Sequence, residues 1–77
     1  MTRVRYFAAA AEAAGTDAEE RSEQTLDELR AAVVADHPAL GGILPRCAVL
    51  VDGVRSDDDR ALGDALLVDV LPPFAGG

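Results

Sequence analysis

The sequence has 77 residues, so it is expected to form one small domain that cannot enclose a large cofactor. Hydrophobic residues make up 49% of it, but with two Phe, one Tyr and no Trp the core must be mainly aliphatic. The formal net charge of −7 repels phosphate backbones and anionic lipid, which disfavours nucleic-acid and membrane roles and suits a partner with a basic docking face.

The first part of the chain predicts a strand, a short helix and a second, weaker strand. In RVRYF (residues 3–7) apolar and basic residues alternate, which is typical of a strand with one buried face. AAAEAA (residues 9–14) is a strong helix-forming stretch, and Gly15 stands where a helix C-cap is expected. Residues 17–24 are nearly all polar, and we expect only a weak edge strand there.

The main helix is predicted from TLDE at residues 25–28. Thr25 is expected to cap the N–H of the third helical residue, and Glu28 to reach back to the N–H of Thr25, which together make a capping box. Pro38 restricts the residue before it, so the helix is expected to end near Asp36. Apolar residues follow the cap at helical spacing: Leu26, Leu29 and Val33.

The stretch after this helix predicts a loop and a hairpin. ALGGILP (residues 39–45) is punctuated by Gly and Pro and is expected to be a loop. CAVLV (residues 47–51) is rich in β-branched residues and predicts a strand. Asp52 and Gly53 form a strong hairpin signal, and the three residues that follow predict a short return strand.

The last predicted strand is ALLVDVL (residues 65–71), which follows a polar loop over residues 57–64. Its residues alternate between two faces, with Leu66, Val68 and Val70 on one and Leu67, Asp69 and Leu71 on the other. The order of elements indicates an α+β fold in which a mixed sheet of four to five strands wraps one main helix. We expect a domain over residues 1–71 and an extended tail over residues 72–77.

The body of this domain contains no set of residues that indicates catalysis or metal binding. Cys47 is in phase with the apolar residues of its strand and is interpreted as a small buried side chain. As a single cysteine it excludes an internal disulfide and a multi-cysteine zinc site. His37 at a helix end is expected to be structural, and the acidic run 57–59 lacks the spacing of a calcium loop. No apolar stretch approaches the ~20 residues of a membrane span, and no signal peptide is apparent, so we expect a cytoplasmic protein.

The C-terminal stretch after the last strand has features that the body lacks. Two prolines, one aromatic residue and three small residues follow in order: Pro72, Pro73, Phe74, Ala75, Gly76 and Gly77. The prolines cannot donate to a sheet and favour an extended chain, so strand pairing is expected to stop there. The aromatic side chain suits a pocket in a partner. The small residues let the end of the chain enter a narrow channel, and six extended residues reach about 20 Å.

The tail and most of the body resemble the ubiquitin-like sulfur carriers, and in particular the MoaD family, the small subunits of molybdopterin synthase. LPPFAGG is close to the tail of that family, and RVRYFAAAAEAAG resembles its first strand and helix. TLDELRAAVVADHPAL resembles its main helix, while VDG and ALGDALLVDVLPP resemble its hairpin and closing strand. The departure lies at residues 17–24, where the family has an apolar-alternating strand. The resemblance implies a β-grasp, ubiquitin-like fold.

The resemblance also implies a sulfur carrier, a non-catalytic subunit rather than a stand-alone enzyme. The carboxylate of Gly77 is a poor electrophile, so an E1-like adenylating enzyme would use ATP to join it to AMP. A sulfur donor would displace AMP and leave a thiocarboxylate on Gly77. A MoaE-like large subunit would then use this sulfur to build the dithiolene of molybdopterin, in molybdenum cofactor biosynthesis. The chain itself would bind no cofactor and no metal.

The same resemblance assigns roles to the tail and to one face of the sheet. Gly76 would keep the approach to the reacting atoms unhindered, and Phe74 with Pro72 and Pro73 would line the entry channel of the partner. Ala75 belongs to the same tail that enters this channel. Three leucines lie out of phase with the presumed core residues and are the predicted docking patch: Leu50, Leu67 and Leu71.

Three other functions remain as alternatives. The chain could carry sulfur for another pathway, such as thiazole, cysteine or a thiolated metabolite, although ThiS-like tails generally lack the Pro-Pro pair. It could be a ubiquitin-like protein modifier that is conjugated to target lysines through Gly77. It could also be an interaction module whose final glycines have no chemical role.

Overall fold

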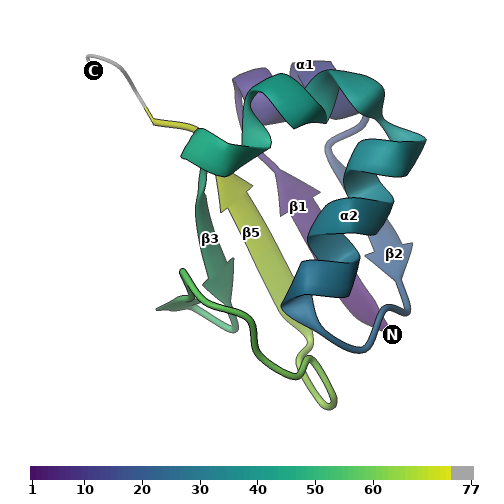
Figure 1. The fold of residues 1–77 in the computed structure, drawn as a ribbon, viewed down its shortest axis with the longest axis vertical. Helices are drawn as coiled ribbons and strands as arrows, with labels where there is room; N and C mark the ends of the chain where they lie inside the picture. Colours follow the sequence, from purple (N-terminus) through teal and green to yellow (C-terminus); the bar gives the residue numbers. More distant parts are fainter. Residues whose placement is uncertain (74–77) are drawn as a thin grey trace.

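A mixed sheet packed on one long helix forms the molecule in this computed structural model, which describes residues 1–73 (Figure 1). Within those residues the sheet has five strands in the order β2-β1-β5-β3-β4. The elements in chain order are β1 (Thr2–Tyr6), α1 (Ala9–Ala14), β2 (Ala18–Arg21), α2 (Leu26–Asp36), two 3-10 turns η1 (Pro38–Gly42) and η2 (Leu44–Arg46), β3 (Ala48–Val51), β4 (Val54–Arg55) and β5 (Leu67–Leu71). The α+β class and the mixed sheet on one main helix are confirmed.

The strand that precedes the tail, β5, lies in the middle of the sheet. It pairs in parallel with β1, where Val4 is opposite Val68, and antiparallel with β3, where Val49 is opposite Val70. In Figure 1 the arrows of β1 and β5 point the same way, toward the end of the sheet where α1 lies. The chain therefore leaves this end of the sheet from a strand that is hydrogen-bonded on both sides.

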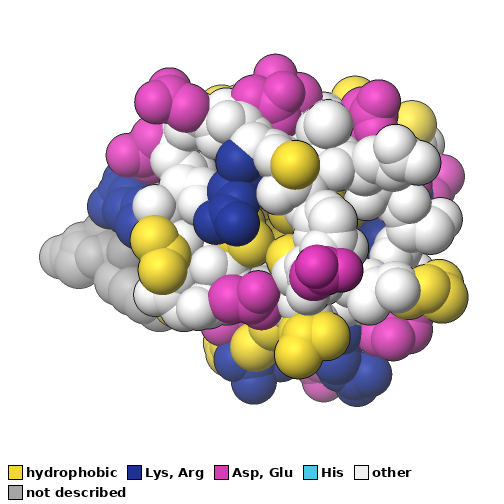
Figure 2. Space-filling view, turned by 90° about the horizontal axis from the view of Figure 1, so that it is seen from below, with side chains coloured by type: hydrophobic (Ala, Val, Ile, Leu, Met, Phe, Trp, Pro, Cys, Tyr) yellow, Lys and Arg dark blue, Asp and Glu magenta, His cyan; other side chains and the backbone are white. Residues whose placement is uncertain are grey.

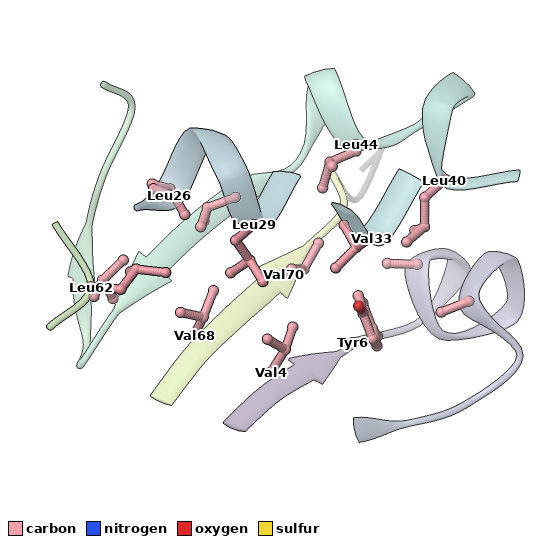
Figure 3. Close-up of a cluster of buried hydrophobic side chains, with 14 of the residues drawn as sticks. Val4, Tyr6, Leu26, Leu29, Val33, Leu40, Leu44, Leu62, Val68 and Val70 are labelled. Carbon is pink, nitrogen blue, oxygen red and sulfur yellow. The ribbon is translucent and has the colours of Figure 1, made fainter. Parts of the chain in front are cut away.

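The core lies between the sheet and α2 and is almost entirely aliphatic (Figure 3). One face of the strands and one stripe of the helix supply it, as the alternation of apolar residues predicts. The 3-10 turns and the loop before β5 close its two ends. Its larger side chains are Val4, Tyr6, Leu26, Leu29, Val33, Leu40, Leu44, Val49, Val51, Leu62, Val68 and Val70.

The start of α2 follows the predicted capping box with one difference. Thr25 Oγ1 accepts the N–H of Glu28 at 3.2 Å, as expected. The Glu28 carboxylate, however, accepts the N–H of Gln24 at 3.2 Å rather than that of Thr25. A bridge between Thr25 and Ala61 keeps the chain extended before the helix, and this brings the Gln24 N–H to Glu28. The helix ends at Asp36, as predicted.

Residues 39–45, which were expected to be a loop, mostly belong to the turns η1 and η2. Two predicted strand starts are wrong. Cys47 follows η2 instead of opening β3, and β5 begins at Leu67 instead of residue 65. Leu66 was expected on the buried face of the last strand, but 74% of its surface is exposed. The N–H groups of Leu66 and Leu67 both donate to Asp52 Oδ1, at 3.0 and 2.9 Å. Consecutive N–H groups of a strand point in opposite directions, so the alternation begins only at Leu67.

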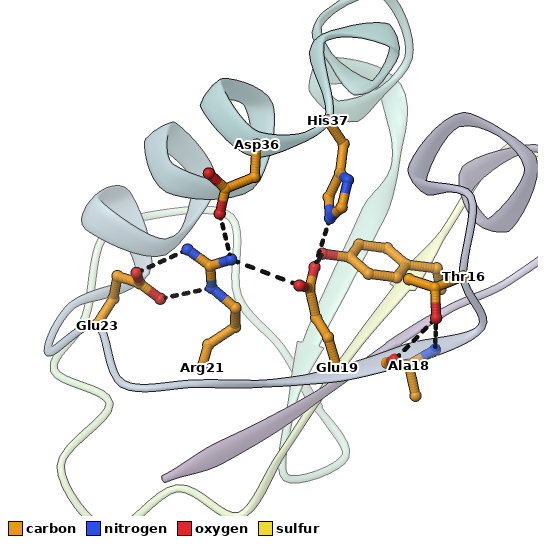
Figure 4. Close-up of polar contacts among 8 residues, drawn as sticks. Thr16, Ala18, Glu19, Arg21, Glu23, Asp36 and His37 are labelled. Carbon is orange, nitrogen blue, oxygen red and sulfur yellow. Dashed lines mark hydrogen bonds and ion pairs between the residues drawn. The ribbon is translucent and has the colours of Figure 1, made fainter.

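The polar stretch that departs from the family pattern does form the edge strand β2, antiparallel to β1. Its inward position Arg21 carries a guanidinium group that bridges to the end of α2 (Figure 4). Arg21 contacts Glu23 at 2.8 Å, Asp36 at 2.6 Å and Glu19 at 3.5 Å. Ion pairing of a charged residue thus replaces the apolar packing that an edge strand would otherwise use.

Glu19, the second inward position of β2, extends this polar cluster. Its Oε2 accepts the hydroxyl of Tyr6 at 2.5 Å and lies 2.9 Å from Nε2 of His37. Burial opposes ionisation of Glu19, but the hydrogen bonds from Tyr6 and His37 outweigh it, so the pKa of Glu19 is lowered. His37, which follows the last residue of α2, therefore has the structural role that was expected.

Candidate functional site

The base of the C-terminal tail is fixed by the sheet on both sides. Leu71, the last residue of β5, is opposite Ala48 of β3, and the N–H of Phe7 donates to the carbonyl of Val70 at 3.1 Å. Strand pairing stops at the Pro-Pro pair, as the missing N–H groups require. The backbone is therefore held up to the residue at which the tail begins.

The two tail prolines have different surroundings. Pro72 is buried against the domain, and Pro73 is exposed. Pro73 is consequently the first residue of the tail whose side chain is available to a partner. The remaining predicted tail residues, Phe74, Ala75, Gly76 and Gly77, lie outside the described residues.

The three leucines predicted as a docking patch lie on one surface, the face of the sheet opposite α2. We call this surface the open sheet face. Leu50, Leu67 and Leu71 are each half-buried, and they alternate with the fully buried residues of β3 and β5. Leu67 and Leu71 flank Asp69 along β5, and Leu50 of β3 lies opposite Asp69. The three side chains thus surround one charged residue on the central strand.

Asp69 forms a bidentate ion pair with Arg5 of β1 on this face. Arg5 Nε and Nη2 lie 2.7 and 2.9 Å from the two carboxylate oxygens of Asp69. The hydrogen bond with Asp69 raises the pKa of Arg5. The Arg5 guanidinium also lies 5.5 Å from the centre of the Phe7 ring, within cation–π distance. The open sheet face therefore combines apolar contact area with a fixed pair of opposite charges.

This ion pair was not predicted, although the signal for it is in the sequence. Arg5 and Asp69 both occupy outward positions of strands that otherwise alternate with buried residues. The missing information was that β1 and β5 are neighbours and that Arg5 is opposite Asp69.

The other candidate residues have structural surroundings. Cys47 was expected to be buried but is only partly so. It donates its thiol to the carbonyl of Ile43 at 3.3 Å, and its partial burial raises its pKa, which disfavours a reactive thiolate. From the acidic run, Asp59 accepts the backbone N–H of Asp27 at 2.8 Å, and Asp57 pairs with Arg55 at 3.1 Å. Among residues 1–73, no group of three or more His, Cys, Asp or Glu side chains is placed to hold a metal ion.

Comparisons with known proteins agree with this arrangement. The chain is 35% identical to the molybdopterin synthase sulfur carrier subunit of Chlamydomonas reinhardtii, over 97% of this chain and 96% of that protein. Its fold matches the crystal structure of SAMP1 from Haloferax volcanii with a TM-score of 0.70 and 26% identity, covering 99% of this chain and 98% of the other. In the described part, no helix combines the length and the apolar character needed to cross a membrane.

The mixed sheet around one helix, with a tail leaving from its central strand, defines a β-grasp protein of the ubiquitin-like class. The ThiS family profile matches residues 4–77, and the chain belongs to the ThiS family. The resemblance to the MoaD and ThiS sulfur carriers that the sequence indicated is thereby confirmed.

Proposed function

We propose that this chain is a sulfur carrier that holds sulfur as a thiocarboxylate on Gly77 and serves as the small subunit of a molybdopterin synthase. The observation that carries the proposal is that the family match runs through Gly77, directly after a strand whose end the structure fixes at Leu71. The relative from Chlamydomonas reinhardtii is named a molybdopterin synthase sulfur carrier subunit and aligns over nearly the whole chain, which supports the same role.

The chemistry needs two activation steps at the acyl group of Gly77. A carboxylate oxygen attacks the α-phosphate of ATP on an E1-like enzyme, which releases pyrophosphate and forms an acyl adenylate. A sulfide-level donor then attacks the acyl carbon, and AMP leaves with the bonding electrons. The product is a thiocarboxylate, whose sulfur is the nucleophile. ATP is used by the activating partner, and the proposal places these steps in the cytoplasm.

Sulfur transfer returns the carrier to its starting state. The thiocarboxylate sulfur adds to an electrophilic carbonyl carbon of the pterin precursor in the large subunit, and this forms an acyl thioester. The electron pair of the C=O π bond moves onto its oxygen, which takes up a proton and is later lost as water. Water then hydrolyses the bond between the acyl carbon and sulfur. The sulfur stays on the pterin, and Gly77 regains a carboxylate. The chain contributes the acyl group and its positioning, and the large subunit contributes the pocket.

The geometry of the described residues supports delivery over a limited distance. Pro73 is the first exposed residue after the sheet, and the four residues beyond it can span at most about 14 Å. A partner must therefore bring its reacting atoms within that distance of Pro73. We propose that the open sheet face provides this contact, with Leu50, Leu67 and Leu71 as apolar area and the Arg5–Asp69 pair as an orienting group.

Intact-mass measurement tests the proposed chemistry. The protein is incubated with an E1-like adenylating enzyme, ATP and a sulfur donor, and one oxygen is expected to be exchanged for one sulfur at Gly77, as mapped by peptide fragmentation. A Cys47→Ser variant is the matched control and should gain sulfur equally. Sulfur that is lost in the Cys47→Ser variant, or that persists after deletion of Gly76 and Gly77, contradicts the proposal.

The remaining candidate functions differ from this one in partner and product. Co-purification with a thiazole or cysteine synthase instead of a large molybdopterin synthase subunit would assign the carrier to another pathway. High-mass adducts that need Gly77 in cells would indicate a protein modifier. The Chlamydomonas reinhardtii relative, which aligns over 97% of the chain, favours the molybdopterin pathway.

A further inference from the structure

A groove lies beside α2 on the helix side of the sheet. Its volume is about 880 Å³, and it is open to solvent along one side. It runs between the second half of α2, the turns η1 and η2, and the end of the β3–β4 hairpin. Its walls include the apolar side chains of Ala31, Val34, Leu44, Pro45 and Cys47.

The charge of this groove differs from that of the whole molecule. In the described part of the chain, three arginines and one aspartate line it: Arg30, Arg46, Arg55 and Asp57. The protein as a whole has fourteen acidic residues and a net charge of −7. Figure 2, which views the molecule from below, shows acidic side chains around much of the outline and basic side chains gathered in separate groups. The groove is thus a local concentration of positive charge on an acidic protein.

The three guanidinium groups keep hydrogen-bond donors for a ligand. Arg46 donates to the carbonyl of Gly42 at 3.3 Å, and no carboxylate within residues 1–73 forms a salt bridge with it. Arg55 pairs with Asp57 at 3.1 Å, but both side chains are largely exposed, and such surface pairs exchange partners at little cost. Arg30 donates to the carbonyl of Ser56 at 3.2 Å, while its distance to Asp27 is 3.8 Å. Each guanidinium has five N–H groups, so these contacts leave others available.

We propose that this groove binds an acidic peptide segment of a partner protein. Guanidinium groups match carboxylates in charge and geometry, so Arg30, Arg46 and Arg55 hold acidic side chains of the segment. The apolar wall takes an aliphatic side chain between them. A single small anion would fill little of the 880 Å³ and leave this wall exposed. A nucleic acid strand would extend beyond the groove over acidic surface, which repels it.

This inference does not depend on the proposed sulfur chemistry. Most of the groove is formed by α2 and the turns η1 and η2, on the helix side of the sheet, whereas Leu67 and Leu71 lie on the open sheet face. Arg55 is opposite Leu50 on β4, so it lies where the two surfaces meet. One partner segment can therefore occupy the groove while another surface contacts Leu67 and Leu71. Arg46 and Cys47 precede Ala48, which is opposite Leu71, so one end of the groove adjoins the strand end from which the tail leaves. An acidic segment bound there would reinforce a complex that handles the tail.

Fluorescence anisotropy with a defined probe tests the proposal. The probe is a short labelled peptide of alternating glutamate and leucine, titrated with the full chain. Binding is expected, and it should weaken as salt is added. Arg46→Gln and Arg55→Gln should each weaken it about threefold, and the double variant about tenfold. Arg60→Gln, an exposed arginine outside the groove, is the matched control and should bind as the unaltered protein does.

Four results would overturn the proposal. The first is equal binding of a peptide in which glutamine replaces glutamate, and the second is an equal loss in Arg60→Gln and Arg46→Gln. The third is displacement of the peptide by a single-stranded oligonucleotide that binds more tightly. The fourth is a severalfold gain in affinity when the chain is shortened to end at Pro73, because this would make the chain's own end the occupant. Thermal melting of each variant shows that it is folded before binding is compared.

Discussion

Asp52 combines a backbone role and a side-chain role at one position. Its φ of 49° and the φ of 84° at Gly53 give the two left-handed residues of a tight hairpin turn between β3 and β4. Its Oδ1 accepts the N–H groups of Leu66 and Leu67, which ties this turn to the start of the central strand. The Asp-Gly pair predicts the turn, but the second role depends on residues far along the chain.

Replacement of Asp52 separates the two roles. Asp52→Ala removes the oxygen that accepts both N–H groups, and it places a residue that disfavours positive φ in the turn. We therefore expect a loss of about 1–3 kcal/mol in the free energy of unfolding. Asp52→Asn keeps an acceptor oxygen and tolerates the turn, so its loss should be well below that of Asp52→Ala. Urea unfolding measures both variants. Equal losses would contradict the role of the side-chain oxygen.

Glu19 links the edge strand to helix α2, and its contribution to stability depends on pH. Its pKa in the folded protein lies below the ordinary value of 4.5. A carboxyl group with a lowered folded pKa stabilises the protein above its unfolded pKa, and this stabilisation is lost as the pH falls through the folded pKa. Since Glu19 accepts hydrogen bonds from Tyr6 and contacts His37, its ionised form is the one that the fold favours.

The variant Glu19→Gln tests this dependence. At neutral pH we expect the variant to unfold with about 1 kcal/mol less free energy than the unaltered protein, because a charged acceptor is lost. The difference should begin to shrink as the pH falls below the ordinary value of 4.5, and it should be lost once the pH is below the folded pKa, where the carboxyl group is neutral in both states. Urea unfolding at the two pH values provides the comparison. A difference that stays constant or grows in acid would contradict the role assigned to the ionised carboxylate.

At the scale of elements, regular alternation and caps made most of the fold predictable. The strand β1, the helices α1 and α2 and the hairpin form where RVRYF, AAAEAA, TLDE and Asp52-Gly53 indicate them. The weak edge strand at residues 17–24 is the instructive case, because its sequence has no strand periodicity. It is stabilised by the ion pairs of Arg21 with Glu23 and Asp36, and these contacts depend on where α2 ends.

The cap of α2 is the local signal whose energy can be measured most directly. Thr25→Ala removes the acceptor for the N–H of Glu28 and should lower the free energy of unfolding by about 1 kcal/mol. Thr25→Ser keeps the hydroxyl and should retain most of the stability. Chemical denaturation followed by circular dichroism measures both. A serine variant as unstable as the alanine variant would show that the hydroxyl is not the stabilising group.

At the scale of the whole molecule, the sheet brings the predicted docking residues together, and it also creates features that the sequence did not predict. Leu50, Leu67 and Leu71 share the open sheet face because all three are out of phase with the core, which the sequence alone indicates. The Arg5–Asp69 pair at their centre could be predicted only from the order of the strands in the sheet. The burial of Pro72 and the arginine-lined groove depend on packing between distant segments, which no local pattern specifies.

Two neighbouring leucines allow a matched test of the docking face. Leu67 lies on the open sheet face, whereas Leu66 is 74% exposed and precedes the strand. Leu67→Ser should weaken binding to the large synthase subunit about tenfold, as expected for loss of an apolar side chain in an interface. Leu66→Ser should leave the affinity unchanged. Isothermal titration calorimetry measures both, and an equal effect of the two substitutions would contradict the proposed face.

The central position of β5 has a mechanical consequence. A force applied to the tail enters the sheet through a strand that β1 and β3 clamp along its length. Such a force loads many backbone hydrogen bonds together in shear, whereas a pull on an outer strand such as β2 would open them one after another. In the proposed sulfur carrier, a partner would therefore draw the end of the chain taut without unravelling the domain that delivers it.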